Sequence, residues 1–105
     1  MLDEQEFRRR AEAALETLKQ HLIALEDSEE AGFEVEEQNG ALNVVFEDPA
    51  GKFVITPNTP VRQIWISARA TSFKLDWAGG RFVLPRTGEE LAPLVERLIH
   101  ENLEG

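Results

Sequence analysis

The spacing of apolar residues changes twice along this 105-residue chain, and these changes constrain the fold more than any other feature. Apolar residues recur every three or four positions over residues 3–26, alternate with polar residues between 33 and 84, and return to helical spacing near the end. The first pattern predicts a helix with one apolar stripe, and the second predicts strands with one buried face. The sequence therefore predicts a helix at each end with strands between them.

The start of the first helix is well marked. Asp3 can cap the helix, with Glu6 at the capping-box position, while Leu2 and Phe7 occupy the two positions of a hydrophobic staple. We therefore expect the first helical residue near Glu4. The apolar stripe comprises Phe7, Ala11, Ala14, Leu15, Leu18, Leu22 and Leu25.

Six short strands follow, and local turn signals separate several of them. Asn39-Gly40 and Gly79-Gly80 suit tight hairpin turns, because these residues tolerate positive φ. Residues 48–51, Asp-Pro-Ala-Gly, suggest a type I turn before a strand at 52–56. Residues 57–60 contain two prolines and are expected to form a loop, because proline cannot donate to a strand ladder.

The last segment has apolar residues at helical spacing from Leu91 to Leu103. Residues 87–90 match a capping box, but a helix that began there would place Pro93 inside the helix, where proline removes a hydrogen bond and clashes with the preceding turn. A start near Glu90 places Pro93 in the first turn, where it is tolerated. We favour the later start.

Both amphipathic helices can be buried if they lie on the same face of one antiparallel sheet. The predicted fold is therefore an α+β, α-β(6)-α two-layer sandwich that forms a single domain over residues 1–105. If Ile64 and Ile66 point into the core, the alternation places Gln63, Trp65 and Ser67 on the opposite, open face. A large aromatic residue there contributes little to folding, so we interpret Trp65 as a contact for a partner.

Charge and cysteine content exclude several classes of function. Eleven basic and twenty acidic residues give a formal net charge of −9, which disfavours nucleic acid and anionic membranes as partners. The chain has no cysteine and so supplies no disulfide, thiolate nucleophile or cysteine-ligated cluster. Its acidic amino terminus does not resemble a signal peptide and no stretch is apolar enough to span a membrane, so we expect a soluble, cytoplasmic protein.

Residues 26–37 contain seven carboxylates and no basic residue. Carboxylates are hard donors that suit iron, magnesium, calcium or manganese, although residues spread over a loop and a strand predict weak binding of several cations. A simple solvated surface is the alternative. His21 and His100 are interpreted as surface residues, and no pattern of catalytic residues is found.

The order of elements, the acidic first half, residues 60–67 (Pro-Val-Arg-Gln-Ile-Trp-Ile-Ser) and Leu-Asp-Trp at 75–77 together resemble the frataxin family, including its bacterial CyaY-type members. The resemblance covers essentially the whole chain. It implies a weakly iron-binding accessory protein of iron–sulfur cluster assembly that docks on the cysteine desulfurase and the scaffold protein. Such a protein is expected to be a monomer, or an oligomer that forms with iron.

The resemblance also implies two sets of functional residues. We call the first the acidic surface, a set of expected ligands for ferrous or ferric iron: Glu16, Glu26, Asp27, Glu29, Glu30, Glu34 and Glu36. We call the second the sheet surface, expected to bind a partner: Asn58, Gln63, Trp65 and Lys74. No catalytic residue is predicted.

This chain departs from the family pattern in its first helix. Lys19, Gln20, Ile23 and Ala24 stand where relatives often have acidic residues, which predicts a reduced capacity for iron. Two other functions remain open at this stage: a ferroxidase that acts on the acidic surface, and a protein-interaction module that needs no metal.

Overall fold

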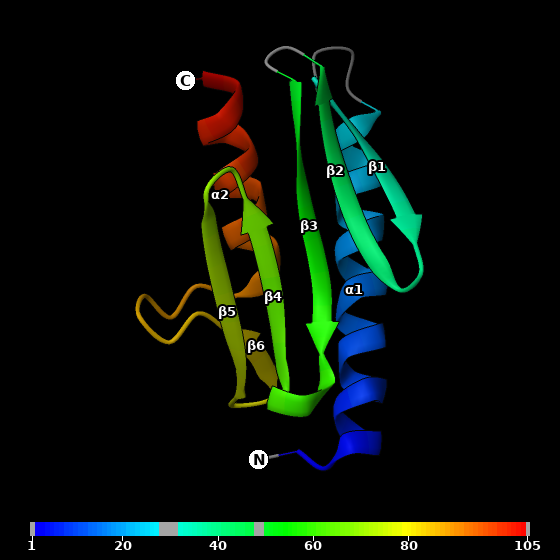
Figure 1. The fold of residues 1–105 in the computed structure, drawn as a ribbon, viewed down its shortest axis with the longest axis vertical. Coiled ribbons are helices and arrows are strands. Elements are labelled where there is room, and N and C mark those ends of the chain that lie inside the picture. The colour runs from blue at the N-terminus through cyan, green and yellow to red at the C-terminus, as the bar shows by residue number, and fades with distance from the viewer. Residues whose placement is uncertain (1, 28–31, 48–49, 105) are drawn as a thin grey trace.

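The structure is a computed structural model that describes residues 2–27, 32–47 and 50–104. Its described residues form two layers, a six-stranded antiparallel sheet with strands in sequence order and two helices that both lie on one face of it (Figure 1). The predicted α-β(6)-α fold is confirmed. The elements are α1 (Glu4–Glu26), β1 (Phe33–Gln38), β2 (Ala41–Glu47), β3 (Ala50–Asn58), η1 (Thr59–Val61), β4 (Gln63–Ala68), β5 (Thr71–Ala78), β6 (Arg81–Val83) and α2 (Leu91–Glu104).

Helix α1 begins as its local sequence predicts. The Asp3 carboxylate accepts a hydrogen bond of 2.8 Å from the backbone N–H of Glu6, which satisfies one of the free donors of the first turn. The Glu6 side chain forms ion pairs with Arg9 and Arg10. Phe7 is fully buried and Leu2 packs against the core, as expected for a staple.

Two of the hairpin turns confirm their sequence signals. Asn39 and Gly40 have φ of 52° and 82°, and Gly79 and Gly80 have φ of 63° and 86°, so both turns use the left-handed region that these residues tolerate. The flanking residues pair directly, Gln38 with Ala41 in the first hairpin. These two turns therefore set the register of the strand pairs β1–β2 and β5–β6.

Strand β3 is longer at both ends than predicted. Ala50 and Gly51 belong to the strand and pair with β2, so they are not part of a turn; Asp48 and Pro49 lie outside the described residues. The loop predicted at 57–60 is also wrong, because Pro57 continues β3 and pairs with Ile64 of β4. The β2–β3 pairing ends at Ile55, so the missing N–H of Pro57 interrupts no ladder on that side.

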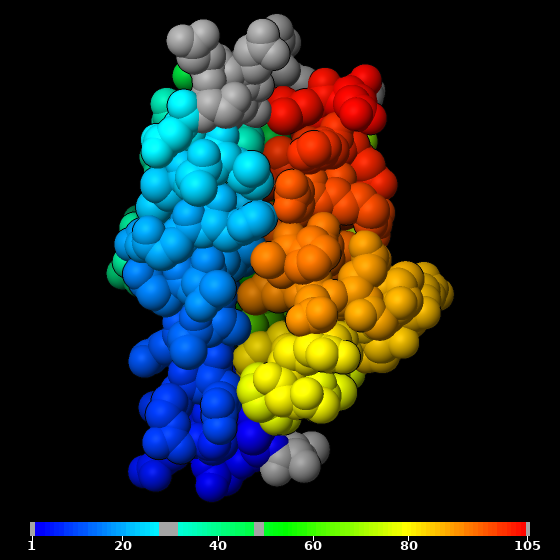
Figure 2. All heavy atoms as spheres, turned by 180° about the vertical axis from the view of Figure 1, so that it is seen from behind, coloured from blue at the N-terminus to red at the C-terminus, as the bar shows by residue number. Residues whose placement is uncertain are grey.

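Helix α2 starts at Leu91, close to the expected position, and Pro93 lies in its first turn. Glu90 makes an isolated bridge with Val83, and its carbonyl accepts the first helical hydrogen bond from Leu94 at 3.0 Å. The two helices lie side by side (Figure 2), and His21 Nε2 of α1 is 3.1 Å from a carboxylate oxygen of Glu96 of α2.

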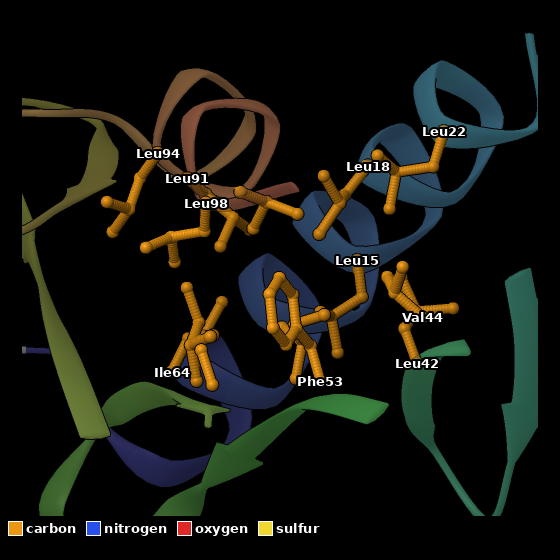
Figure 3. Close-up of a cluster of buried hydrophobic side chains, with 14 of the residues drawn as sticks. Leu15, Leu18, Leu22, Leu42, Val44, Phe53, Ile64, Leu91, Leu94 and Leu98 are labelled. Carbon is orange, nitrogen blue, oxygen red and sulfur yellow. The ribbon is translucent and has the colours of Figure 1, made fainter. Parts of the chain in front are cut away.

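The core lies between the helices and the inner face of the sheet. Leucines of α1 and α2 point towards side chains of β2, β3 and β4 (Figure 3). Ile64, Ile66 and Leu75 are fully buried and cover the centre of the sheet's inner face. Because side chains alternate along a strand, this burial fixes the residues between them on the outer face.

Candidate functional site

The sheet surface lies on the outer face, away from both helices. Asn58 of β3 pairs with Gln63 of β4, and Trp65 of β4 pairs with Lys74 of β5. Gln63 and Trp65 are two residues apart on one strand, so the four side chains share one face of the sheet. The structure therefore brings all four predicted residues together, although whether they bind a partner stays a prediction.

Side-chain contacts hold Trp65 in place. Its indole Nε1–H donates to Oε1 of Gln63 at 2.8 Å, and Nε2 of Gln63 donates to Oδ1 of Asp76 at 2.9 Å. The ammonium of Lys74 lies 4.8 Å from the centre of the indole ring, within range of a cation–π interaction. Trp65 is consequently half-buried rather than fully exposed, although it points outward as predicted.

An unusual backbone conformation leads the chain into β4. Arg62 follows the short helix η1 with φ of 56° and ψ of 45°, a left-handed conformation that is uncommon for an arginine. Its guanidinium donates to the carbonyl of Leu2 at 3.3 Å and also to the carbonyl of Thr59. These contacts hold Arg62 in place directly before Gln63, the first residue of β4.

Most of the described residues of the acidic surface lie at the carboxyl end of α1 and on β1. Glu34 and Glu36 are exposed on β1, paired with Val45 and Asn43 of β2 and facing the outer side of the sheet. Asp27 is exposed at the carboxyl end of α1. The predicted ligands Glu29 and Glu30 lie outside the described residues.

Glu26 has a structural contact of its own. Its carboxylate accepts a hydrogen bond from the backbone N–H of Val35, a half-buried residue of β1. Strand β1 is at the edge of the sheet, so this N–H points away from β2 and has no partner strand. Glu26 therefore attaches the end of α1 to the sheet edge.

Glu16 belongs to a different part of the surface. Ten residues of α-helix separate it from Glu26, a rise of about 15 Å, so the two carboxylates cannot share one metal ion. Glu16 instead lines a cavity of about 460 Å³ between α1 and the 39–40 turn, together with Glu12 and Glu37. Among the residues that the structure describes, the predicted ligands thus form two groups, one with Glu16 and one with Glu26, Asp27, Glu34 and Glu36.

Lys19 and Gln20 follow Glu16 on α1 and contact carboxylates of its group, and Lys19 brings a positive charge to it. The ammonium of Lys19 is 3.6 Å from a carboxylate oxygen of Glu37, and Nε2 of Gln20 donates to Glu16 at 3.1 Å. A cation that approached this region would compete with the internal ammonium. The reduced iron capacity that the resemblance implies stays a prediction, and these are the contacts that would cause it.

The donor chemistry of the acidic surface suits iron, but its geometry is open. Carboxylate oxygens are the hard ligands that iron accepts. Within residues 2–27, 32–47 and 50–104, no three His, Asp or Glu side chains are close enough together to hold a metal ion. An open arrangement leaves most coordination positions to water, so any binding by these residues would be weak.

Two carboxyl groups that lie outside the acidic surface and the sheet surface have a pKa lowered by an arginine. Hydrogen bonds from Arg97, at 2.7 and 2.9 Å, hold the pKa of Glu89 below its ordinary value. A hydrogen bond from Arg9 does the same for the pKa of Glu6. The Glu6–Arg9 pair lies within α1, and the Glu89–Arg97 pair joins the segment before α2 to that helix. Neither pair faces the sheet surface.

Asp76, the central residue of the Leu-Asp-Trp motif, is a residue of this face for which the sequence predicts no role. The structure places Asp76 directly opposite Gln63, in contact with its amide. The available signal was the alternation of β5, which puts Asp76 on the outer face beside β4.

In the described part of the chain, no helix is long and apolar enough to cross a membrane.

The fold defines the class of protein: two helices on one face of a six-stranded antiparallel meander, with an aromatic residue on the open face. The family model for the frataxin-like domain matches residues 1–105, and the chain belongs to the frataxin family.

The chain is also similar to curated relatives named iron-sulfur cluster assembly protein CyaY. The relative from Ralstonia nicotianae is 31% identical over 103 residues, covering 98% of this chain and 90% of the relative. The relative from Ralstonia pickettii is 32% identical over 101 residues, covering 95% and 88%.

Solved structures agree with the fold. The frataxin from Psychromonas ingrahamii superposes with a TM-score of 0.74 at 19% identity, covering 96% of this chain and 91% of that one. A trimeric frataxin from the yeast Saccharomyces cerevisiae, complexed with ferrous iron, gives a TM-score of 0.75 at 20% identity, covering 91% and 87%. At these identities the likeness establishes the architecture and not the residues of a site.

Proposed function

We propose that this protein is an iron-binding accessory protein of iron–sulfur cluster assembly that docks on the cysteine desulfurase and its scaffold protein. The observation that carries the proposal is the presence, on a frataxin fold, of two chemically different surfaces: carboxylates along α1 and β1, and a half-buried tryptophan held on the open sheet face. The names of the curated relatives support the assembly role. The yeast neighbour complexed with ferrous iron supports iron as the metal.

The acidic surface would attract iron as cargo and a basic partner surface at long range. Glu34 and Glu36 are exposed and share a face, with Cα atoms about 7 Å apart along the strand, and the described residues add no third ligand close enough to complete a metal site. Binding through separate, water-sharing carboxylates should be weak and sensitive to salt. We expect a monomer in the absence of iron, with any oligomer dependent on the metal.

The sheet surface would supply the short-range contact. Trp65 presents a large apolar ring whose edge and one face are held by Gln63 and Lys74, so it can be buried against a partner with little reorganisation. Contact area of this kind is screened very little by salt. The two surfaces together would attract a partner and then retain it.

Equilibrium binding tests this function. Calorimetry with the cysteine desulfurase of the same organism, with and without scaffold protein, should detect binding that weakens with salt and that Trp65→Ala weakens further. Ser67→Ala, an exposed change on the same face of β4, is the matched control and should bind as the wild type does. Failure to bind the desulfurase in either setting would reject the proposed function and leave only the fold.

An interaction module that needs no metal is the second candidate, and specific contacts favour it. Glu26 accepts from Val35, and Glu37 is paired with Lys19, so two carboxylates of this region already have partners within the protein. Anaerobic addition of ferrous iron to 15N-labelled protein separates the candidates. Shifts or broadening at Glu34 and Glu36 would support iron binding, whereas an unchanged spectrum together with intact desulfurase binding would favour the metal-free module.

A further inference from the structure

A continuous chain of side-chain contacts crosses from β5 to β4 on the outer face of the sheet. Asp76 accepts from Nε2 of Gln63 at 2.9 Å, and Oε1 of Gln63 accepts from the indole N–H of Trp65 at 2.8 Å. All three residues are half-buried. Asp76 thus acts on Trp65 only through the amide of Gln63.

The chemistry of the two end groups determines the orientation of the amide between them. An indole N–H acts only as a hydrogen-bond donor, and an ionised carboxylate acts only as an acceptor. The Gln63 amide can satisfy both only with its oxygen towards Trp65 and its nitrogen towards Asp76, as observed. If Asp76 were removed, the amide could rotate and place its NH₂ group against the indole N–H, so that two donors would face each other.

The indole ring is also held from its face. Lys74 pairs with Trp65 across the β4–β5 ladder, and its ammonium lies 4.8 Å from the ring centre. Lys74 thus holds the ring from β5 directly, independently of the Gln63 amide. The ring therefore has two supports, Gln63 and Lys74, and the contact recorded for Asp76 is with Gln63.

We propose that Asp76 is the positioning residue of the sheet surface: it fixes the Gln63 amide so that the Trp65 indole holds one orientation before any partner binds. The inference rests on the proposed function in that Trp65 is taken to contact a partner. A side chain that is already ordered loses less conformational freedom on binding. Loss of Asp76 should therefore weaken binding although Asp76 need not touch the partner.

The first test uses the free protein and does not depend on any partner. The chain has two tryptophans, so its spectrum contains two indole N–H signals, and Trp77, packed edge-to-face against Phe82 with centroids 5.0 Å apart, serves as the internal reference. In Asp76→Ala the Trp65 indole proton should move upfield and exchange with solvent about fivefold faster, while the Trp77 signal stays in place. Ser72→Ala, exposed on the same face of β5, should change neither signal.

Two further variants distinguish positioning from a general loss of stability. Asp76→Asn keeps an acceptor oxygen and should restore most of the wild-type Trp65 signal. In a Gln63→Ala background, Asp76→Ala should have no additional effect on Trp65, because the connecting amide is gone. A Trp65 signal that is unchanged in folded Asp76→Ala, or equal effects of Asp76→Ala with and without Gln63, would overturn the inference.

Binding to the desulfurase completes the test. Asp76→Ala should weaken affinity about three- to tenfold, less than Trp65→Ala does, and Asp76→Asn should recover most of the loss. If Trp65→Ala weakens binding but Asp76→Ala does not, positioning has no role in docking and the inference fails alone. If both variants bind as the wild type does, the sheet surface is not the docking surface, and the part of the proposed function that assigns docking to Trp65 fails with the inference; no binding by the wild type rejects the proposed function itself.

Discussion

Replacing Glu26 by alanine should destabilise the fold, because its carboxylate satisfies a backbone donor at the edge of the sheet. The N–H of Val35 has no partner strand and is half-buried, so water can replace the carboxylate only in part. Hydrogen bonds to charged groups contribute about 1.5–3 kcal/mol when well shielded, and partial exposure reduces this to about 1 kcal/mol here. For a chain of this size that corresponds to a decrease in Tm of about 4–8 °C.

A matched set of variants isolates this contact. Glu26→Gln keeps an acceptor oxygen and removes the charge, so it should lose less than half as much stability as Glu26→Ala. Glu16→Ala, an exposed change on the same helix, should stay within about 0.5 kcal/mol of the wild type. Urea unfolding monitored by circular dichroism measures all three. Equal stability of Glu26→Ala and Glu16→Ala would show that the contact between Glu26 and Val35 contributes nothing measurable to the fold.

Three further outcomes follow from the structure. Ile64→Ala should cost about 2–5 kcal/mol in urea unfolding because the residue is fully buried, whereas Ser67→Ala on the outer face should cost under about 0.5 kcal/mol; similar losses would mean that the assigned register of β4 is wrong. Lys19→Glu removes the ammonium paired with Glu37, so calorimetry should show about two- to fivefold tighter Mn²⁺ binding at low salt and a smaller gain at high salt. Unchanged affinity would show that the internal ion pair does not limit cation binding. Arg97 lowers the pKa of Glu89, so the pair stabilises the fold above the ordinary pKa of 4.5, and this contribution is lost as the pH falls through the lower pKa of the folded state. Arg97→Gln should remove that part of the pH dependence of the unfolding free energy. An unchanged pH profile would argue against the pair.

The features that could be predicted from the sequence are those with local causes. The Asp3 cap, the Asn39-Gly40 turn and the position of Pro93 in α2 depend on residues within one turn of each other. The outward direction of Trp65 follows from the buried residues on each side of it. For these features, nearby residue types carry the necessary information.

The features that were missed depend on distant parts of the chain. Pro57 is tolerated in β3 because the β2 pairing ends before it, which residues 57–60 alone do not reveal. The contact of Glu26 with Val35 requires the end of α1 to lie at the sheet edge, and the contact of Asp76 with Gln63 requires the β4–β5 register. The pairing of Lys19 with Glu37 likewise joins α1 to β1. Such contacts follow from the packed fold and not from composition or spacing.

If the two surfaces act at different stages of docking, they should affect different rate constants, which association kinetics with the desulfurase–scaffold complex can separate. Rates should be measured at low and high salt for the wild type, for Trp65→Ala and for the double charge reversal Glu34→Lys with Glu36→Lys. We expect Trp65→Ala to raise the dissociation rate by about tenfold or more with little change in association, and the charge reversal to slow association mainly at low salt. Equal effects of both variants on the same rate constant, or no effect of either, would contradict this expectation.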